Sequence, residues 1–214
     1  MNASKFESLT GQVDLEFPEY DAPPAEPIAL LQRWLAAAVA HGVREPRALS
    51  LATAAADGRA SNRIVAITAI DQRGLVFLSH TSSRKGRELA ATRWASGVLY
   101  WRETGQQVII SGTVDPLADG ESDTLWFARP IPMHAMSAVS RQSEPLLDRD
   151  ALRSEADRLA ALQAPLPRPS RFVGYRLEPR EVEFWSASSD RLHRRLRYDR
   201  ADEGGDWSTS QLQP

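Results

Sequence analysis

The 214-residue sequence contains no cysteine and only two lysines, Lys5 and Lys85, against 24 arginines. The lack of cysteine excludes disulfide bonds, thiolate metal sites and a cysteine nucleophile. A GC-rich genome produces an excess of arginine by default. The alternative is that a retained lysine lies where an arginine would not serve, because the two side chains are not interchangeable.

Long apolar segments are also missing. The first 13 residues lack the apolar stretch of a secretory signal, and no apolar run approaches the ~18 residues that cross a bilayer. The net charge of −2 argues against binding to nucleic acid through bulk charge. We therefore expect a soluble, cytoplasmic protein that binds neither membranes nor nucleic acids.

Several common catalytic motifs are absent. The sequence has no GxGxxG, no phosphate-binding GxxxxGK[ST], no HExxH, no GxSxG and no EF-hand loop. The four histidines have no metal-like spacing, which predicts no metal site: His41, His80, His134 and His193.

Length and composition fit one globular domain. Residues 1–25 are acidic and contain prolines without a sustained period, so we expect an N-terminal arm that is mobile or lies on a partner. Residues 26–214 are expected to form the single domain. Its first element is a helix that begins at Pro27 and ends near Gly42, because apolar residues recur there at helical spacing.

Short extended segments dominate the rest. Glycine-containing turns at Asp57-Gly58, Arg73-Gly74 and Thr104-Gly105 predict antiparallel hairpins. Strands are predicted at 48–55, 63–70, 75–80, 97–103, 106–114, 172–179 and 180–187, and helices at 83–92, 121–128 and 148–163. Residues 131–147 show no regular pattern. The fold class is therefore mainly antiparallel β, a barrel with peripheral helices.

One polar cluster follows a predicted strand directly. Ser83, Arg84 and Lys85 open a helix, which offers a phosphate free N–H groups, a hydroxyl and two cations. Arg63 would add a third cation if its strand pairs with 75–80. An ordinary surface helix is the more frequent reason for such a pattern.

The basic run 191–200 is a second cluster. It holds five arginines but a single aromatic residue, Tyr198, whereas single-stranded nucleic acid is bound by basic residues interleaved with several aromatics. A solvated face balanced by the acidic residues of 199–206 is the interpretation that composition favours.

Both clusters belong to a longer series of short segments that follow one another in a fixed order along the chain. They are RIVAIT, FLSHTSSRKG, YWRETGQQVIISGTV, FARP, SRQSE, PLPRP, VEFW and RLHRRLRY, with a closing LQP. From about residue 28 to the C-terminus, the chain resembles the pyridoxine 5′-phosphate oxidase family of FMN-dependent flavoproteins. It looks most similar to the branch found in phenazine biosynthesis. The resemblance implies an FMN-binding split β-barrel and a homodimer with FMN at the subunit interface.

The resemblance also implies which residues bind FMN. Arg84 and Lys85 correspond to the family's phosphate clamp, and Arg195 to a cation that favours reduced flavin at its N1 edge. The full implied set is Arg63, Ile64, Val65, Ala66, Thr68, Ser79, Arg84, Lys85, Gln107, Gln142, Ser143, Trp185 and Arg195.

The implied substrate site departs from that of the vitamin B6 enzyme. That enzyme holds its substrate phosphate with a lysine, a tyrosine, an arginine and a serine, and the corresponding positions here are Thr68, Leu125, Arg129 and Met133. Only the arginine remains, and each missing charged hydrogen bond costs roughly 1.5–3 kcal/mol. The more apolar wall suits a flat tricyclic aromatic substrate.

Arg191 and His193 match the family's Arg-x-His that contacts substrate over the flavin. They are the catalytic candidates: together they could hold a carboxylate, and His193 could exchange a proton.

The resemblance thus implies an FMN-dependent oxidase of phenazine biosynthesis. It would oxidise reduced (dihydro, tetrahydro or hexahydro) carboxylated precursors by hydride transfer to FMN, with reoxidation by O₂. A divergent pyridoxamine/pyridoxine 5′-phosphate oxidase is the alternative enzyme. A non-catalytic split barrel that binds flavin or nucleic acid is the alternative from another class.

Overall fold

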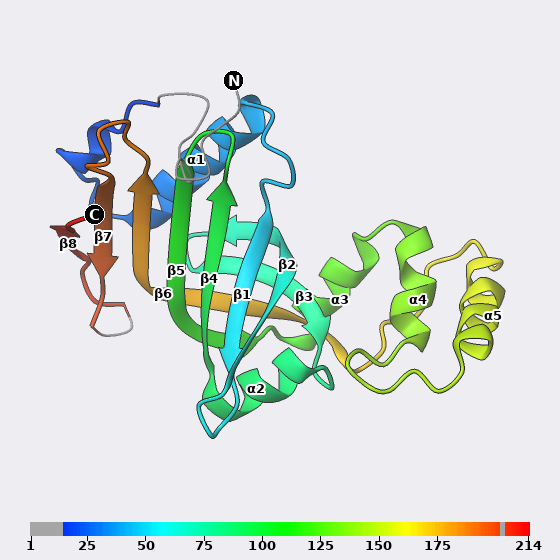
Figure 1. Ribbon diagram of the computed structural model, residues 1–214. Coiled ribbons are helices and arrows are strands. Elements are labelled where there is room, and N and C mark those ends of the chain that lie inside the picture. Colours follow the sequence, from blue (N-terminus) through cyan, green and yellow to red (C-terminus); the bar gives the residue numbers. More distant parts are fainter. Residues whose placement is uncertain (1–14, 202–203) are drawn as a thin grey trace.

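The computed structural model describes residues 15–201 and 204–214. Eight strands form one antiparallel sheet in the order β3-β2-β1-β4-β5-β6-β7-β8, and a further pairing of β3 with β6 closes β1 to β6 into a barrel (Figure 1). The strands are β1 (Ala48–Ala54), β2 (Ala60–Asp71), β3 (Gly74–His80), β4 (Trp94–Trp101), β5 (Gln106–Pro116), β6 (Phe172–Ser186), β7 (Arg194–Asp199) and β8 (Ser208–Gln211). The predicted antiparallel barrel with peripheral helices is confirmed.

The hairpin turns lie where the sequence places them. Gly58 and Gly105 have positive φ angles of 83° and 61°, which glycine adopts at no steric cost. These turns set the registers of β1 with β2 and of β4 with β5.

Strand β6 differs from the prediction. The chain does not break into two strands after Pro179, but continues as one 15-residue strand with a bulge at Arg180, opposite Ser111 and Gly112. A bulge tolerates a proline, which has no N–H to donate to a ladder. Its two halves have different partners, because 172–177 pairs with β3 and 181–186 pairs with β7.

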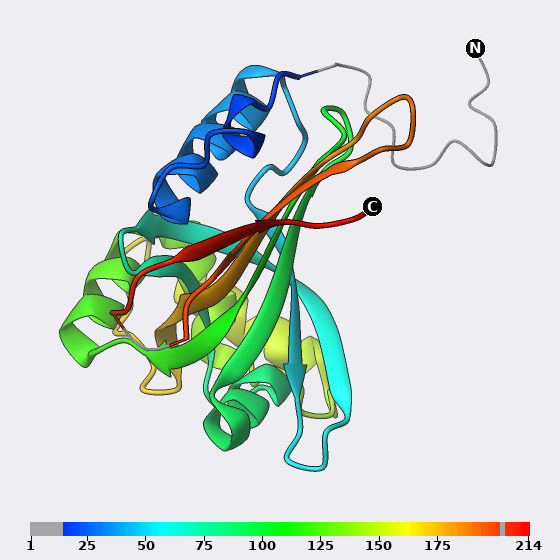
Figure 2. The same ribbon diagram turned by 90° about the vertical axis from the view of Figure 1, so that its left-hand side faces the viewer.

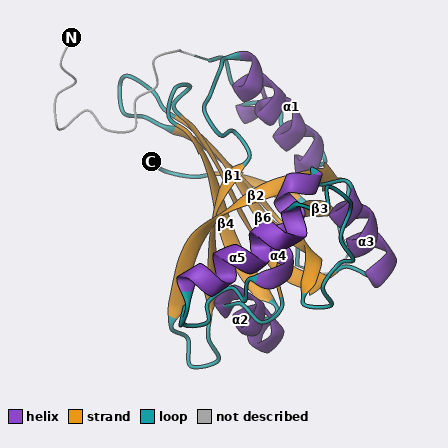
Figure 3. Cartoon of the chain, turned by 90° about the vertical axis from the view of Figure 1, so that its right-hand side faces the viewer, coloured by secondary structure: helices purple, strands orange, loops and turns teal. Residues whose placement is uncertain are grey.

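The helices lie outside the barrel. They are α1 (Pro27–Ala40), α2 (Arg84–Thr92), α3 (Asp119–Phe127), α4 (His134–Val139) and α5 (Arg149–Ala160). α3, α4 and α5 gather on one side as a helical wing (Figures 1 and 3). The wing has its own small core around Trp126, Leu166 and Phe172.

Helix α4 lies in the segment that the sequence left irregular. It has only six residues and no side-chain cap, so local propensity gives no signal. Tertiary contacts hold it: His134 is buried, lies against Trp126 at 4.4 Å between ring centroids, and accepts the backbone N–H of Leu166.

Part of the expected N-terminal arm packs on the domain itself. Residues 1–14 lie outside the described residues, but Phe17 is 2% exposed and meets Trp34 edge to face at 4.8 Å. Tyr198 donates a hydrogen bond to the Pro24 carbonyl, and Gln211 donates one to the Tyr20 carbonyl. Residues 15–25 therefore lie along α1 and the C-terminal strands (Figure 2).

The described ranges contain neither a membrane-spanning helix nor a cluster of metal ligands. No helix in them is long and apolar enough to cross a membrane. No group of three or more histidine, aspartate or glutamate side chains in them could hold a metal ion.

Candidate functional site

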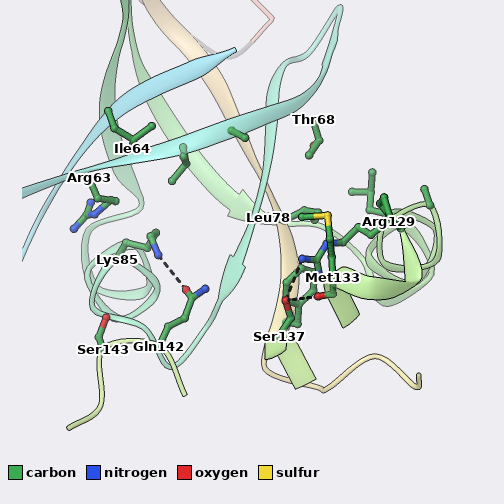
Figure 4. A pocket seen from close by; sticks show the side chains of 16 residues that line it. Arg63, Ile64, Thr68, Leu78, Lys85, Arg129, Met133, Ser137, Gln142 and Ser143 are labelled. Carbon is green, nitrogen blue, oxygen red and sulfur yellow. Dashed lines mark hydrogen bonds between the residues drawn. The ribbon is translucent and has the colours of Figure 1, made fainter. Parts of the chain in front are cut away.

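A cavity of about 820 Å³ lies between the barrel and the helical wing. Figure 4 shows Arg63, Lys85, Gln142 and Ser143 on one side of it and Arg129 with Met133 on the other. Of the residues predicted to bind cofactor or substrate, those that line the cavity are Arg63, Ile64, Val65, Ala66, Thr68, Lys85, Leu125, Arg129, Met133, Gln142 and Ser143.

One end of this cavity is polar, and Lys85 lies at its centre. Its ammonium group donates to Ser79 Oγ at 2.9 Å and to Gln142 Oε1 at 3.3 Å. Burial and the positive charge of Arg63 both lower the pKa of Lys85. The cation is therefore held in a place that costs free energy until an anion joins it.

The start of α2 completes this end. Ser83 caps the helix by accepting the backbone N–H of Gly86, and Ser143 accepts the backbone N–H of Arg84 at 3.0 Å. Ser79 and Arg84 thus contact residues that line the cavity, although they do not line it themselves. The polar end of the cavity is therefore formed by residues from β2, α2 and the 142–143 segment.

Sequence reasoning missed the residue that links two of these cations. Glu88, buried on α2, forms ion pairs with Arg63 and Arg84. The available signal was its position four residues after Arg84, which places both on one helix face.

Arg129 dominates the other end. Its guanidinium lies 4.7 Å from the ring centre of Phe172 and 5.2 Å from that of Trp126, and it donates to Ser137 Oγ at 3.0 Å. Its Nη1 is buried without a hydrogen-bond partner among the described residues. Arg129 thus lines the cavity with one buried donor unsatisfied, and a guanidinium group is suited to bind a carboxylate or phosphate.

Thr68 is the residue at which β2 bulges. The pairing of β2 with β3 shifts register between Ile67 and Ala69, and the Thr68 hydroxyl donates to the Val76 carbonyl at 3.0 Å. That hydroxyl is thus committed to the backbone. The wall is neutral where the vitamin B6 enzyme would have a lysine.

The remaining predicted residues form a second group away from the cavity. Gln107, Trp185 and Arg195 lie side by side across β5, β6 and β7. His193 packs on the Trp185 ring at 4.8 Å, and Arg195 pairs with buried Glu183 at 2.7 and 3.0 Å. Neither these four nor Arg191 lines the cavity of the same chain.

Comparisons with known proteins give a consistent picture. The profile described as "Pyridoxamine 5′-phosphate oxidase" matches residues 35–163, and that described as "Pyridoxine 5′-phosphate oxidase C-terminal dimerisation region" matches residues 172–214. Dihydrophenazinedicarboxylate synthase of Burkholderia lata is 65% identical over 214 residues, all of both chains. The synthase of the same name from Pseudomonas chlororaphis is 51% identical, over 97% of this chain and 93% of that one.

More distant relatives include the pyridoxine/pyridoxamine 5′-phosphate oxidase of a Janthinobacterium species, 36% identical over 96% of this chain and 97% of that protein. Among solved structures, PhzG from Burkholderia lata in complex with tetrahydrophenazine-1-carboxylic acid superposes with a TM-score of 0.92 at 64% identity, covering 95% of this chain and all of that one. The resemblance to the phenazine-biosynthesis branch is confirmed, and the chain belongs to the pyridoxine/pyridoxamine 5′-phosphate oxidase family.

Proposed function

We propose that the protein is an FMN-dependent oxidase of phenazine biosynthesis that acts on reduced, carboxylated phenazine precursors. The observation that carries this proposal is the division of one cavity into a cationic end at Lys85 and an apolar end with the partly unpaired Arg129. The names of the two synthases and of the superposed structure support the substrate class.

The cavity residues fit FMN. Among the residues that the structure describes, neither aspartate nor glutamate lines the cavity, so none of the described lining side chains repels a phosphate. Lys85, Arg84 and Arg63 would hold the phosphate, and the β2 segment 64–66 would lie beside the flavin ring. Bound FMN would supply the hydride acceptor, with O₂ as the final acceptor of the two electrons and H₂O₂ as the product.

The chain's own residues bind and orient the substrate. Arg129 provides donors for its carboxylate, while Leu125 and Met133 cover a flat ring system and exclude water from it. His193 Nδ1 accepts the backbone N–H of Ser188 at 3.1 Å, which leaves Nε2 as the atom that carries the exchangeable proton.

The second group acts in a homodimer. Gln107, Trp185, Arg195 and His193 are remote from the cavity of their own chain, and we propose that they complete the cavity of the partner subunit. The dimerisation region named in the family profile, residues 172–214, includes three of the four. FMN would then lie at the subunit interface, with each chain supplying part of both sites.

Hybrid dimers test this division. At an FMN concentration that loads the wild type but not the variants, Lys85→Met and Arg195→Gln are each expected to inactivate a homodimer, but a hybrid has one site with both changes and one with neither. Random exchange of equal amounts should restore about a quarter of the wild-type activity, because half of the dimers are hybrids with one intact site. No recovery after demonstrated subunit exchange would show that the Lys85 and the Arg195 of each site come from the same chain.

The reaction is tested with purified protein. Bound flavin should be visible in the absorbance spectrum, and dihydro- or tetrahydrophenazine carboxylic acids should bleach it anaerobically, with recovery on admission of O₂. The absence of bleaching by every reduced phenazine would refute the substrate assignment.

The 36–40% identical pyridoxine/pyridoxamine 5′-phosphate oxidases support the alternative of a divergent vitamin B6 enzyme. Thr68→Lys tests it, because this change restores one cation but not the hydroxyls that Leu125 and Met133 replace. We expect kcat/KM for pyridoxine 5′-phosphate to stay at least about a hundredfold below that for the reduced phenazine, since each missing bond costs roughly 1.5–3 kcal/mol. Comparable values in a variant with full FMN content would favour the alternative.

A further inference from the structure

Glu88 is a buried carboxylate that gathers donors from three elements. Its side chain accepts from Thr53 Oγ1 at 2.5 Å, from Ser61 Oγ at 2.6 Å and from Arg84 Nε at 2.8 Å, and Arg63 Nη2 lies 3.4 Å away. β1, β2 and α2 each contribute at least one of these groups. The residue does not line the cavity, so it acts on a ligand only through its neighbours.

The carboxylate is charged at neutral pH. Burial raises its pKa, but hydrogen bonds from Ser61, Thr53 and Arg84 outweigh burial and bring the pKa of Glu88 to about 2. A buried carboxylate is tolerated when it is paired and hydrogen-bonded in this way.

Hydrogen bonds to groups other than Glu88 restrain one of its two arginine partners more than the other. Arg63 also donates to the Leu51 carbonyl at 3.2 Å and to Thr53 Oγ1 at 2.6 Å, both neutral acceptors. Arg84 has a largely exposed side chain whose Nε is bound to Glu88, and its two terminal amino groups have no protein partner within the described ranges. Glu88 therefore restrains a long side chain while leaving its outer donors available.

The net charge at the polar end of the cavity is opposite in sign and similar in size to that of a phosphate. Three cations, Arg63, Arg84 and Lys85, and one carboxylate, Glu88, leave two positive charges. A phosphate monoester carries about −1.5 to −2 at pH 7. Lys85 meets the ligand from the cavity wall, and Glu88 lies behind the two arginines.

We propose that Glu88 is a positioning residue of the FMN phosphate site: it holds Arg63 and Arg84 in place, although its charge takes one positive charge from the site. The inference rests on the proposed function as an FMN enzyme. It assigns to Glu88 a role in phosphate recognition that a purely structural buried carboxylate would not have.

The variant Glu88→Gln distinguishes the effect of Glu88 on the position of the two arginines from its effect on the net charge of the site. Glutamine keeps the volume and one acceptor, but it removes the negative charge and places an amide N–H₂ among donors. Charge alone would make the variant bind FMN more tightly, because the site gains one net positive charge. Loss of position should weaken FMN binding roughly ten- to a hundredfold, and binding of riboflavin, which has no phosphate, should change less than about twofold.

The measurement is quenching of flavin fluorescence by apo-protein, with FMN and riboflavin titrated in parallel. Ser61→Ala removes one hydroxyl from the same network without a change of charge, and it should shift the FMN to riboflavin affinity ratio in the same direction by a smaller factor. Glu155→Gln, the same chemical change in an exposed pair with Arg158 on α5, should leave the ratio unchanged.

The outcomes are distinct. Unchanged or tighter FMN binding by Glu88→Gln overturns the inference, and so does equal weakening of FMN and riboflavin, which would indicate a structural role alone. If the wild-type protein binds FMN, these results leave the proposed function standing. If the wild-type protein binds neither flavin, the proposed function fails and this inference fails with it.

Discussion

Replacing Lys85 with methionine is expected to weaken FMN binding by one to two orders of magnitude, because a charged hydrogen bond is worth about 1.5–3 kcal/mol. Apo-protein stability should be unchanged or higher. Burial and the charge of Arg63 lower the pKa of Lys85, so the bare cation costs free energy that methionine does not. A loss of ligand affinity together with a gain of stability is the signature of a residue kept for binding.

Three measurements check this expectation: the FMN dissociation constant, the riboflavin dissociation constant and the thermal midpoint of apo-protein. Arg158→Met is the matched control, since it also removes a cation, from an exposed ion pair on α5. It should leave all three values unchanged. FMN affinity within about threefold of the wild type in Lys85→Met would contradict the assignment of the phosphate end.

The second large effect concerns Trp126, which supports the helical wing. The side chain is fully buried, its Nε1 donates to the Leu166 carbonyl at 2.7 Å, and its ring packs on His134 and Phe172. Truncation of a buried tryptophan to alanine costs about 3–5 kcal/mol. The thermal midpoint of Trp126→Ala should therefore fall by roughly 10 °C or more.

The same change should act on the substrate end more than on the cofactor end. The guanidinium of Arg129 lies over both the Trp126 and the Phe172 rings, so it loses one of its two aromatic contacts. We expect KM for the reduced phenazine to rise several-fold, with FMN affinity close to the wild-type value, below the temperature at which the variant unfolds.

Trp94→Ala is the control for tryptophan truncation, because Trp94 is 46% exposed at the start of β4. Its cost should be about 1 kcal/mol or less. Similar losses of stability in both variants, or equal losses of FMN and substrate affinity in Trp126→Ala, would contradict the role of Trp126 as a support of the substrate end.

Local signals in the sequence predicted much of the fold. Gly58 and Gly105 have the positive φ that their turns need, and Ser83 caps α2 as a serine before a helix is expected to. Where the sequence failed, a long-range contact decided. β6 stays one strand because a bulge opposite Gly112 accommodates the step past Pro179, and α4 forms because His134 is held by the wing.

The candidate site was predicted as one set of residues by family resemblance, but the structure divides it. Residues 63–68, Lys85, Arg129 and the 142–143 segment line one cavity, whereas Gln107, Trp185 and Arg195 lie across three neighbouring strands elsewhere. A motif gives the types of residue and their order. It does not show whether a residue completes the cavity of its own subunit or that of the partner. That assignment depends on the closure of the barrel and on the proposed dimer.

Lys85 and Thr68 show what the sequence determined and what the tertiary structure determined. The sequence by itself showed that Lys85 was retained beside Arg84 while Thr68 stands where a lysine would be expected. Only the tertiary structure decided why this matters: Lys85 reaches Ser79 and Gln142 at the cavity, and the Thr68 hydroxyl is bound to the Val76 carbonyl at a bulge. The network around Glu88 became visible only there, since three of its four donors lie on β1 and β2, which folding brings against α2.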